Sequence, residues 1–383
     1  MSEPIQLAPG QPTRAELREI ERLCHEHAMD AQRMQTQLES LVADAVERPF
    51  AVAFDGLSAA LGAALSALGA TAGTDVVLPA LAPPILGAAL VRSGARPCYA
   101  DVDAKSLTLN AHHASARLTT ATRVIVGAAN HGQPAGLDSL AALASRNELP
   151  LLEFVCGGLG GRVGRDPVGR FGRISVIALT ERESPIGCGG AVCVTNDDLL
   201  AGALRTMRSG GEPEPRNDWE RIGGIRPIER IGFDSRMGLL RAAIGVNRLS
   251  RLERTSEALE QVFHGYLRRL AMHPDLVLPA PCTDGMVRWS HFAVRLSERY
   301  SRDDRDSIVS GMLRHDIAAT SVVRALPLEP AFAGGHRAGD FPVAERAAER
   351  LIALPYSASL GERDIDLICQ TLQVMIERQS ILR

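Results

Sequence analysis

The chain has 383 residues, of which 45% are hydrophobic, and a formal net charge of −3 at pH 7. This length can bury the core of a large domain and a smaller one, and the charge excludes a general role in binding nucleic acid or an anionic membrane surface. The seven cysteines are scattered and lack C-x-x-C spacing, which argues against a disulfide framework and a zinc site. No secretory signal or membrane-spanning stretch is recognisable, so we expect a soluble, cytoplasmic protein.

Residues 14–47 carry dense charge with apolar residues at helical spacing, which predicts one or two amphipathic helices. Beyond residue 50, short apolar runs alternate with Ala-rich helical segments. This alternation predicts βαβ units and a mainly parallel sheet. The expected strands lie within 50–56, 74–80, 96–103, 122–130, 149–155, 174–179 and 191–195, and the expected helices within 57–69, 83–94 and 137–148.

The second half of the chain differs in character. Residues 209–232, rich in Gly, Pro and Arg, predict an extended loop, and one long helix is expected at about 236–272. The remaining expected elements are a strand at 288–296 and helices at 303–315 and 362–380. We therefore expect an N-terminal helical segment (1–50), a large domain (51–250), and a connecting helix with a small C-terminal domain (251–383).

Four segments carry a resemblance to a known family. They read "HGQPAGLDSLAALASRNELPLLE" (131–153), "GGAVCVTND" (189–197), "IGFDSRMGLLRAAIG" (231–245) and "GDFPVAERAAERLIALP" (339–355). In this order they resemble nucleotide-sugar aminotransferases of the DegT/DnrJ/StrS type. The resemblance implies the α/β architecture of fold-type-I pyridoxal-phosphate (PLP) enzymes, with a mainly parallel sheet flanked by helices and a smaller C-terminal α/β domain. It also implies a homodimer and a nucleotide-linked keto-sugar substrate.

The chain departs from this family where the family binds PLP. The resemblance places the Schiff-base lysine in the turn after 174–179, where Glu183 stands, or Glu181 or Arg182 if the turn differs slightly in length. None of these is a lysine, and Lys105, the only lysine of the chain, belongs to a different turn. Because a Schiff base needs an amine, we expect that no PLP cofactor is present.

Other positions implied by the resemblance have also changed. Phe154 stands where the family has the aspartate that pairs with the pyridine nitrogen, and Asp234 replaces an asparagine that the partner subunit offers to the phosphate. Ser58 can still donate at the phosphate loop, although Asp55 comes just before it. Phe154 can equally be core filling, and the two aspartates can be caps or turn residues. The candidate ligand-binding residues are Asp55, Ser58, His131, Phe154, Asp234 and Arg236, and Glu183 is the candidate catalytic residue.

Three functions stay open at this point. The first is a degenerate sugar-aminotransferase homologue that binds a sugar-like, amine-bearing ligand or stabilises an intact paralogue in a sugar or secondary-metabolite pathway. The second is a cofactor-independent enzyme that uses an acidic cavity formed by Asp55, Glu183 and Asp234. The third is an aminotransferase or dehydratase that depends on PLP or pyridoxamine phosphate (PMP). In each case we expect a homodimer, or a heterodimer with a paralogue, and no metal, nucleic-acid or membrane partner.

Overall fold

A seven-stranded sheet forms the centre of the computed structural model, which describes residues 5–6, 14–26, 30–180, 184, 186–215, 217–223, 225–321, 323–332 and 334–382. The strand order is β1-β10-β9-β6-β5-β2-β4. Strands β9, β6, β5, β2 and β4 run parallel, whereas β10 pairs antiparallel with both β1 and β9, so the predicted mainly parallel sheet is confirmed. The strands are β1 Phe50–Phe54, β2 Asp75–Pro79, β4 Arg96–Ala100, β5 Thr122–Ala129, β6 Leu151–Val155, β9 Ile174–Ala178 and β10 Ala191–Thr195.

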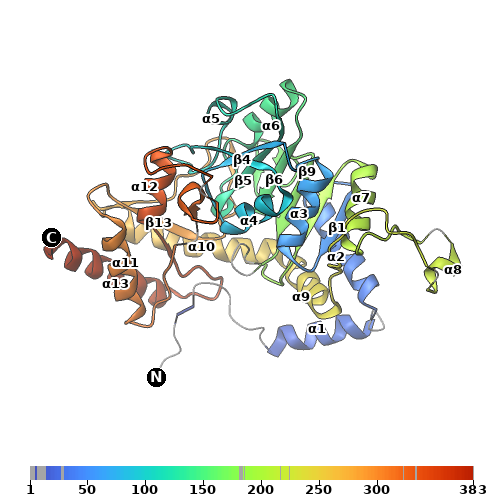
Figure 1. Ribbon diagram of the computed structural model, residues 1–383. Coiled ribbons are helices and arrows are strands. Elements are labelled where there is room, and N and C mark those ends of the chain that lie inside the picture. The colour runs from blue at the N-terminus through green and yellow to red at the C-terminus, as the bar shows by residue number, and fades with distance from the viewer. Residues whose placement is uncertain are drawn as a thin grey trace.

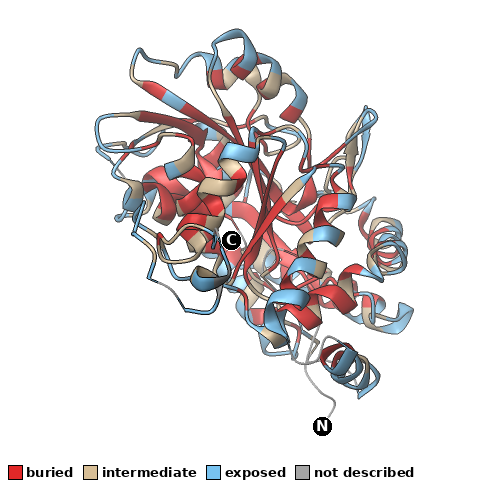
Figure 2. Ribbon diagram, turned by 90° about the vertical axis from the view of Figure 1, so that its right-hand side faces the viewer, coloured by how far each residue is buried: buried red, intermediate tan, exposed pale blue. Residues whose placement is uncertain are grey.

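Helices cover both faces of this sheet (Figure 1). Alternate strand residues point to opposite faces, so Val52 and Phe54 of β1 join one apolar cluster while Ala51 and Ala53 join another. Helices α3 Leu57–Ala67, α4 Pro84–Ser93 and α7 Asp198–Arg208 belong to the first cluster; α1 Arg14–Glu26, α2 Ala31–Ala45 and α9 Leu239–Leu249 belong to the second. Helices α5 Ala111–Ser115 and α6 Leu137–Arg146 pack near the other end of the sheet. Most residues of these strands are accordingly buried (Figure 2), with the start of the edge strand β4 as an exception.

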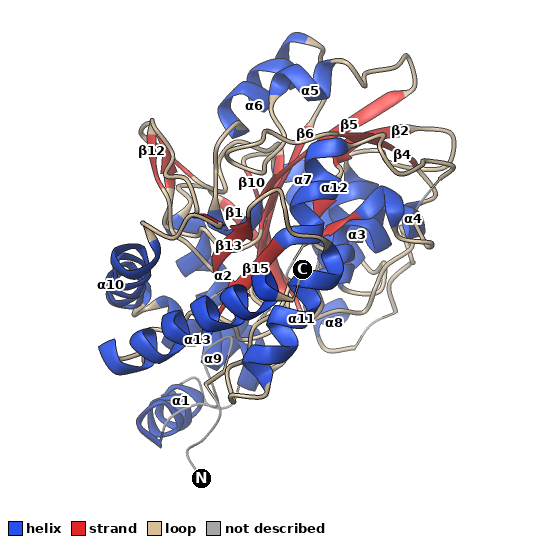
Figure 3. Ribbon diagram, turned by 90° about the vertical axis from the view of Figure 1, so that its left-hand side faces the viewer, coloured by secondary structure: helices blue, strands red, loops and turns tan. Residues whose placement is uncertain are grey.

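A further apolar core lies in the C-terminal part of the chain. Figure 3 shows the strands and helices of this part. Its three-stranded antiparallel sheet has the order β11-β13-β15, with β11 Leu276–Val277, β13 Phe292–Leu296 and β15 Leu351–Leu354. It packs against α10 Leu252–Leu270, α11 Arg302–Leu313 and α13 Glu362–Ile381, while α12 Pro342–Arg350 contributes to the core of the large sheet. The division into three parts at residues 50 and 250 stays a prediction. Among the described helices, none combines the length and apolar character needed to cross a bilayer.

The expected single helix over 236–272 is wrong. The structure has α9, which ends at Leu249, and α10, which begins at Leu252. The break lets α9 pack against α2 and α10 pack against α13, so the two helices serve different cores. The predicted extended loop at 209–232 is largely irregular but includes α8 Asp218–Arg221, which lies on a projecting arm (Figure 1).

Short strands complete the fold. They tie loops of the large sheet to segments of the C-terminal part, since β14 pairs with β3 and β12 pairs with β7. These pairings hold segments of the C-terminal part against the loops of the large sheet. The short strands are β3 Leu81–Ala82, β7 Arg162–Val163, β8 Asp166–Pro167, β12 Gly285–Met286 and β14 Arg324–Ala325.

Candidate functional site

At the start of α3, the end of β1 lies in close contact with the turn before β10. The chain leaves β1 at Phe54, turns through Asp55 and Gly56, and enters α3. Gly190, at φ +77°, lies so close that a Cβ there would be 2.3 Å from the Phe54 carbonyl oxygen. Only glycine permits both this conformation and this contact. The glycine turn before β10 therefore packs directly against the N-terminus of α3.

This helix start has the features of an anion site. Gly56 occupies the N-cap and, within the described chain, no side chain caps the helix. The first turn of a helix presents backbone N–H groups and a partial positive charge. Ser58 lies in this turn, and its hydroxyl accepts a hydrogen bond from Arg92 Nη1 at 2.6 Å. An anion placed here would meet the Ser58 hydroxyl, the Arg92 guanidinium and the helix N-terminus together.

Of the two described aspartates expected at this site, Asp55 is paired with an arginine and Asp234 is exposed. Asp55 Oδ2 forms a 2.8 Å ion pair with Arg241, which also donates to the Asp55 carbonyl oxygen. Asp234 and Arg236 are exposed, while Ser235 between them accepts a hydrogen bond from Gly56 N through its hydroxyl. The 234–236 segment thus docks on the α3 start of its own chain. It does so through Ser235, which the sequence did not single out.

Glu183, the candidate catalytic residue, lies outside the described residues, as do Glu181 and Arg182. The catalytic assignment of Glu183 therefore stays a prediction. So does the acidic cavity that would join it to Asp55 and Asp234. Two of these three carboxylates lie within the described residues. Asp55 is ion-paired with Arg241, and Asp234 is exposed.

Phe154 lies within the core of the large sheet. It is fully buried on β6, opposite Ala128 of β5 and Val176 of β9. Its ring adds apolar contact area and brings no polar group. The expectation that Phe154 binds a ligand stays a prediction, and its alternative role as core filling matches this burial.

Glu153, next to Phe154, points to the opposite face and has a different role. Its carboxylate accepts hydrogen bonds from the backbone N–H groups of Gly169, Phe171 and Gly172 and from the Ser175 hydroxyl. Burial raises the pKa of Glu153, and these four donors oppose that shift by stabilising the charged form. This carboxylate therefore fixes the loop between β8 and β9.

His131 lies where the large sheet meets the C-terminal part. It has φ +57° in the 3₁₀ turn after β5, and its carbonyl oxygen accepts from Ser290 N at 3.0 Å. The ring is buried, 5.6 Å between centroids from the ring of His291, and no described residue bonds to its Nε2 atom. Burial, with a smaller contribution from His291, lowers the pKa of His131 to about 3. His131 is therefore neutral at physiological pH, and its ligand-binding role stays a prediction.

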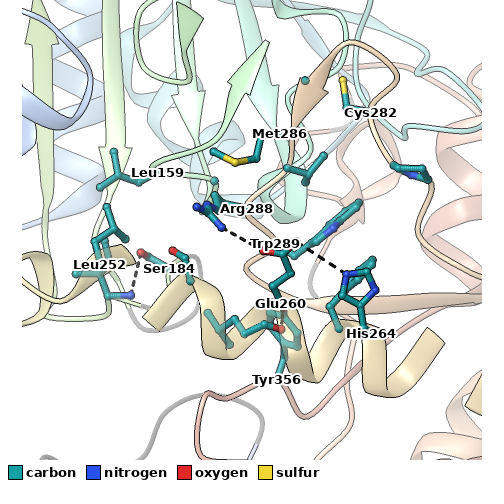
Figure 4. Close-up of a pocket in the computed structure, with 18 residues that line it drawn as sticks. Leu159, Ser184, Leu252, Glu260, His264, Cys282, Met286, Arg288, Trp289 and Tyr356 are labelled. Atoms are coloured by element: carbon teal, nitrogen blue, oxygen red, sulfur yellow. Dashed lines mark hydrogen bonds and ion pairs between the residues drawn. The ribbon is translucent and has the colours of Figure 1, made fainter. Parts of the chain in front are cut away.

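A separate cavity of about 300 Å³ lies between α10 and residues 281–289 (Figure 4). Sequence reasoning missed it, because its walls come from segments far apart in the chain. The one local signal is Trp289, an aromatic residue just before β13. The residues that line the cavity include Leu159, Ser184, Leu252, Leu259, Glu260, Phe263, His264, Cys282, Met286, Arg288, Trp289 and Tyr356.

Comparison with known proteins identifies the family. Residues 12–373 match the model of the DegT/DnrJ/EryC1/StrS aminotransferase family. The chain belongs to this family. It is 28% identical over 343 residues to the GDP-perosamine synthase of Caulobacter vibrioides, covering 89% of this chain and 90% of that one. It is 24% identical over 349 residues to the spore coat polysaccharide biosynthesis protein SpsC of Bacillus subtilis, covering 89% of each.

Solved structures share the fold. The aminotransferase TlmJ of Streptoalloteichus hindustanus superposes with a TM-score of 0.86 at 22% identity, covering 98% of this chain and all of that one. The protein Spr1654 of Streptococcus pneumoniae, described as a sugar aminotransferase and solved in a PMP form, superposes with a TM-score of 0.88 at 18% identity over 99% of each chain. The fold-type-I aminotransferase architecture is thereby confirmed. The family match and the PMP form of Spr1654 contradict the prediction that no PLP is present, and it is withdrawn.

The described residues fit the phosphate group of such a cofactor better than its pyridine ring. The start of α3, with Ser58 and Arg92, suits a phosphate group. At Phe154, where the resemblance places the partner of the pyridine nitrogen, the buried side chain supplies no carboxylate. Lys105 is exposed in a turn where Asp103 accepts from its backbone N–H, away from these residues. Only the phosphate contacts can therefore be assigned to described side chains.

Proposed function

We propose that this chain acts on a sugar-linked substrate together with a pyridoxal-type cofactor that is anchored by its phosphate group and not by a lysine. Family membership supports both the sugar and the cofactor. The names of curated relatives mention nucleotide-linked sugars, as in GDP-perosamine synthase and UDP-2-acetamido-2-deoxy-3-oxo-D-glucuronate aminotransferase. The observation that carries the proposal is the uncapped start of α3, where Ser58 and Arg92 lie together.

The anchoring follows from the chemistry of the side chains. A phosphate group accepts several charge-assisted hydrogen bonds, and a guanidinium, a hydroxyl and free N–H groups of a helix supply suitable donors. The turn that carries the family's lysine offers no amine, since Lys105 is the only lysine of the chain. When bound, the cofactor supplies amine and electron-sink chemistry. Phe154 places no charge beside it, so we expect that chemistry to be slower than in relatives that carry a carboxylate.

The test is a titration of the purified protein with PMP by calorimetry. We expect Ser58→Ala to weaken PMP binding roughly tenfold, because a hydrogen bond to a charged group contributes about 1.5 kcal/mol. Ser66→Ala, an exposed change at the other end of the same helix, is the matched control and should bind like wild type. Equal PMP affinities for the two variants, or no PMP binding by the wild type, would overturn the proposal.

A second measurement separates phosphate anchoring from covalent anchoring. Borohydride reduction of the PLP-loaded protein should leave the cofactor removable, and peptides covering residues 174–194 should carry no added mass. The reason is that this segment contains no primary amine. A reduced pyridoxyl adduct on any residue of this segment would contradict the account.

We also propose that the chain forms a dimer through its projecting arm. Four isoleucines there are strongly exposed, although isolated exposed apolar residues are ordinary and only a group of them points to a partner. The partner is a second copy of this chain, because the arm leads directly into the 231–245 segment by which the chain resembles its dimeric family. A heterodimer with a paralogue would appear as co-purification of a second chain. The four residues are Ile222, Ile225, Ile228 and Ile231.

A further inference from the structure

The cavity between α10 and residues 281–289 shares no residue with the α3 start. Apolar side chains form most of its wall, with Leu259 and Phe263 on α10 facing Met286 and Trp289. Its volume of about 300 Å³ lies at the lower end of the range for small-molecule sites, about 300–1,000 Å³. It is therefore suited to a ligand with a single ring.

Aromatic stacking and close backbone packing support the walls of this cavity. Trp289 stacks on Phe263 with ring centroids 5.2 Å apart and an interplanar angle of 7°, and Phe263 in turn contacts Phe292 edge-on. On the opposite side, the backbone around Met286 packs so closely on Gly161 that a Cβ there would lie 2.9 Å from the Met286 carbonyl oxygen. The indole of Trp289 is only half-buried, so part of it is available to a ligand. Binding would need little reorganisation of the protein.

The charged groups at the cavity do not balance. Arg288 forms a 2.6 Å ion pair with Glu253. It also forms a 3.5 Å pair with Glu260 (Figure 4), so two carboxylates share one guanidinium. The Arg288 side chain is only 12% exposed, whereas Glu260 is 60% exposed. Glu260 lines the cavity and is held by the longer of the two contacts with Arg288. His264 Nε2 lies 3.9 Å from Glu260 and carries a charge only when protonated. With a neutral His264, this group favours an added positive charge. The cavity thus combines an apolar aromatic wall with a carboxylate that favours an added positive charge.

We propose that this cavity binds an amino sugar. The protonated amine pairs with Glu260, and the apolar face of the ring packs on Trp289, where a nearby ammonium gains further attraction to the indole. A neutral sugar would lose the Glu260 interaction, and a sugar phosphate would be repelled by both carboxylates. The choice of a sugar ring rests on the proposed function, whereas the charge preference rests on the cavity alone.

Fluorescence of Trp289 provides the test. The chain has two tryptophans, and Trp219 lies on the exposed arm, so Trp219→Phe leaves Trp289 as the only indole. In this background, D-glucosamine should change the emission, and N-acetyl-D-glucosamine, which keeps the ring but has no charged amine, should bind at least tenfold more weakly. Equal affinity for the two sugars, or an unchanged emission with both, would overturn the inference.

Glu260→Gln provides the second arm, with Glu257→Gln as the matched control. Both glutamates are exposed on α10, but only Glu260 lines the cavity. Glu260→Gln should remove the preference for glucosamine, and Glu257→Gln should keep it. Identical behaviour of the two variants would refute the assignment. If PMP still binds while glucosamine does not, this inference alone fails; if neither binds, the proposed function fails as well.

Discussion

Protonation of His131 should destabilise the protein in mild acid. The pKa of His131 is lowered to about 3 in the folded chain from an ordinary value of 6.5. The folded pKa lies below the unfolded one. The contribution of neutral His131 to the free energy of unfolding is therefore complete above about pH 6.5 and is lost as the pH falls toward 3. With about 1.36 kcal/mol for each pKa unit, the loss is about 2 kcal/mol at pH 5. Acid should therefore loosen the contact between the His131 turn and the segment before β13.

Urea unfolding at pH 8, 6 and 5 measures this effect. His131→Asn removes the titrating group and keeps a residue type that tolerates the positive φ of this position. Between pH 8 and pH 5, we expect the free energy of unfolding of the variant to fall by about 2 kcal/mol less than that of the wild type. His112→Asn, at an exposed position on α5, is the control and should follow the wild type. If His131→Asn shows the same pH dependence as wild type, the buried neutral histidine is not the cause.

Three further changes probe the scaffold. Glu153→Gln should lower the free energy of unfolding, measured in urea, by about 2–3 kcal/mol, because a neutral amide replaces the carboxylate that accepts four hydrogen bonds. The exposed change Glu148→Gln should alter it little. Equal effects of the two changes would contradict the role of Glu153 in fixing the loop. Gly132→Ala should lower Tm far more than Gly164→Ala, because both have positive φ but only the first Cβ would meet backbone, at 2.1 Å. Ile225→Glu should convert a dimer to monomer in sedimentation, and an unchanged dimer would exclude the arm.

Much of the large domain could be predicted because its signals are local. The run "FAVAF" at 50–54 and the following Ala-rich segment form β1 and α3, since β-branched and aromatic residues favour strands and alanine favours helices. The split between α9 and α10 could not be predicted in this way. Residues 236–272 keep a helical pattern throughout, and the break arises because the two halves pack against helices from opposite ends of the chain.

The sequence indicated where Asp55 and Ser58 lie in the fold, but not which side chains contact them. Asp55 and Ser58 lie at the start of α3, as the resemblance implied. The resemblance could not supply Arg92 and Arg241, which approach from other helices and change the charge around these two residues. With 42 Lys and Arg residues in the chain, no sequence pattern marks which of them reach this point. The prediction that no cofactor is present is contradicted by the family match and by the PMP form of a structural neighbour.

A crystal structure of the protein soaked with PMP and a nucleotide sugar tests the central claim most directly. The account predicts the cofactor phosphate at the N-terminus of α3, within hydrogen-bond distance of the Ser58 hydroxyl, with no covalent bond to the protein. A cofactor bound elsewhere, a covalent link to Lys105, or crystals that bind the sugar but no cofactor would contradict it.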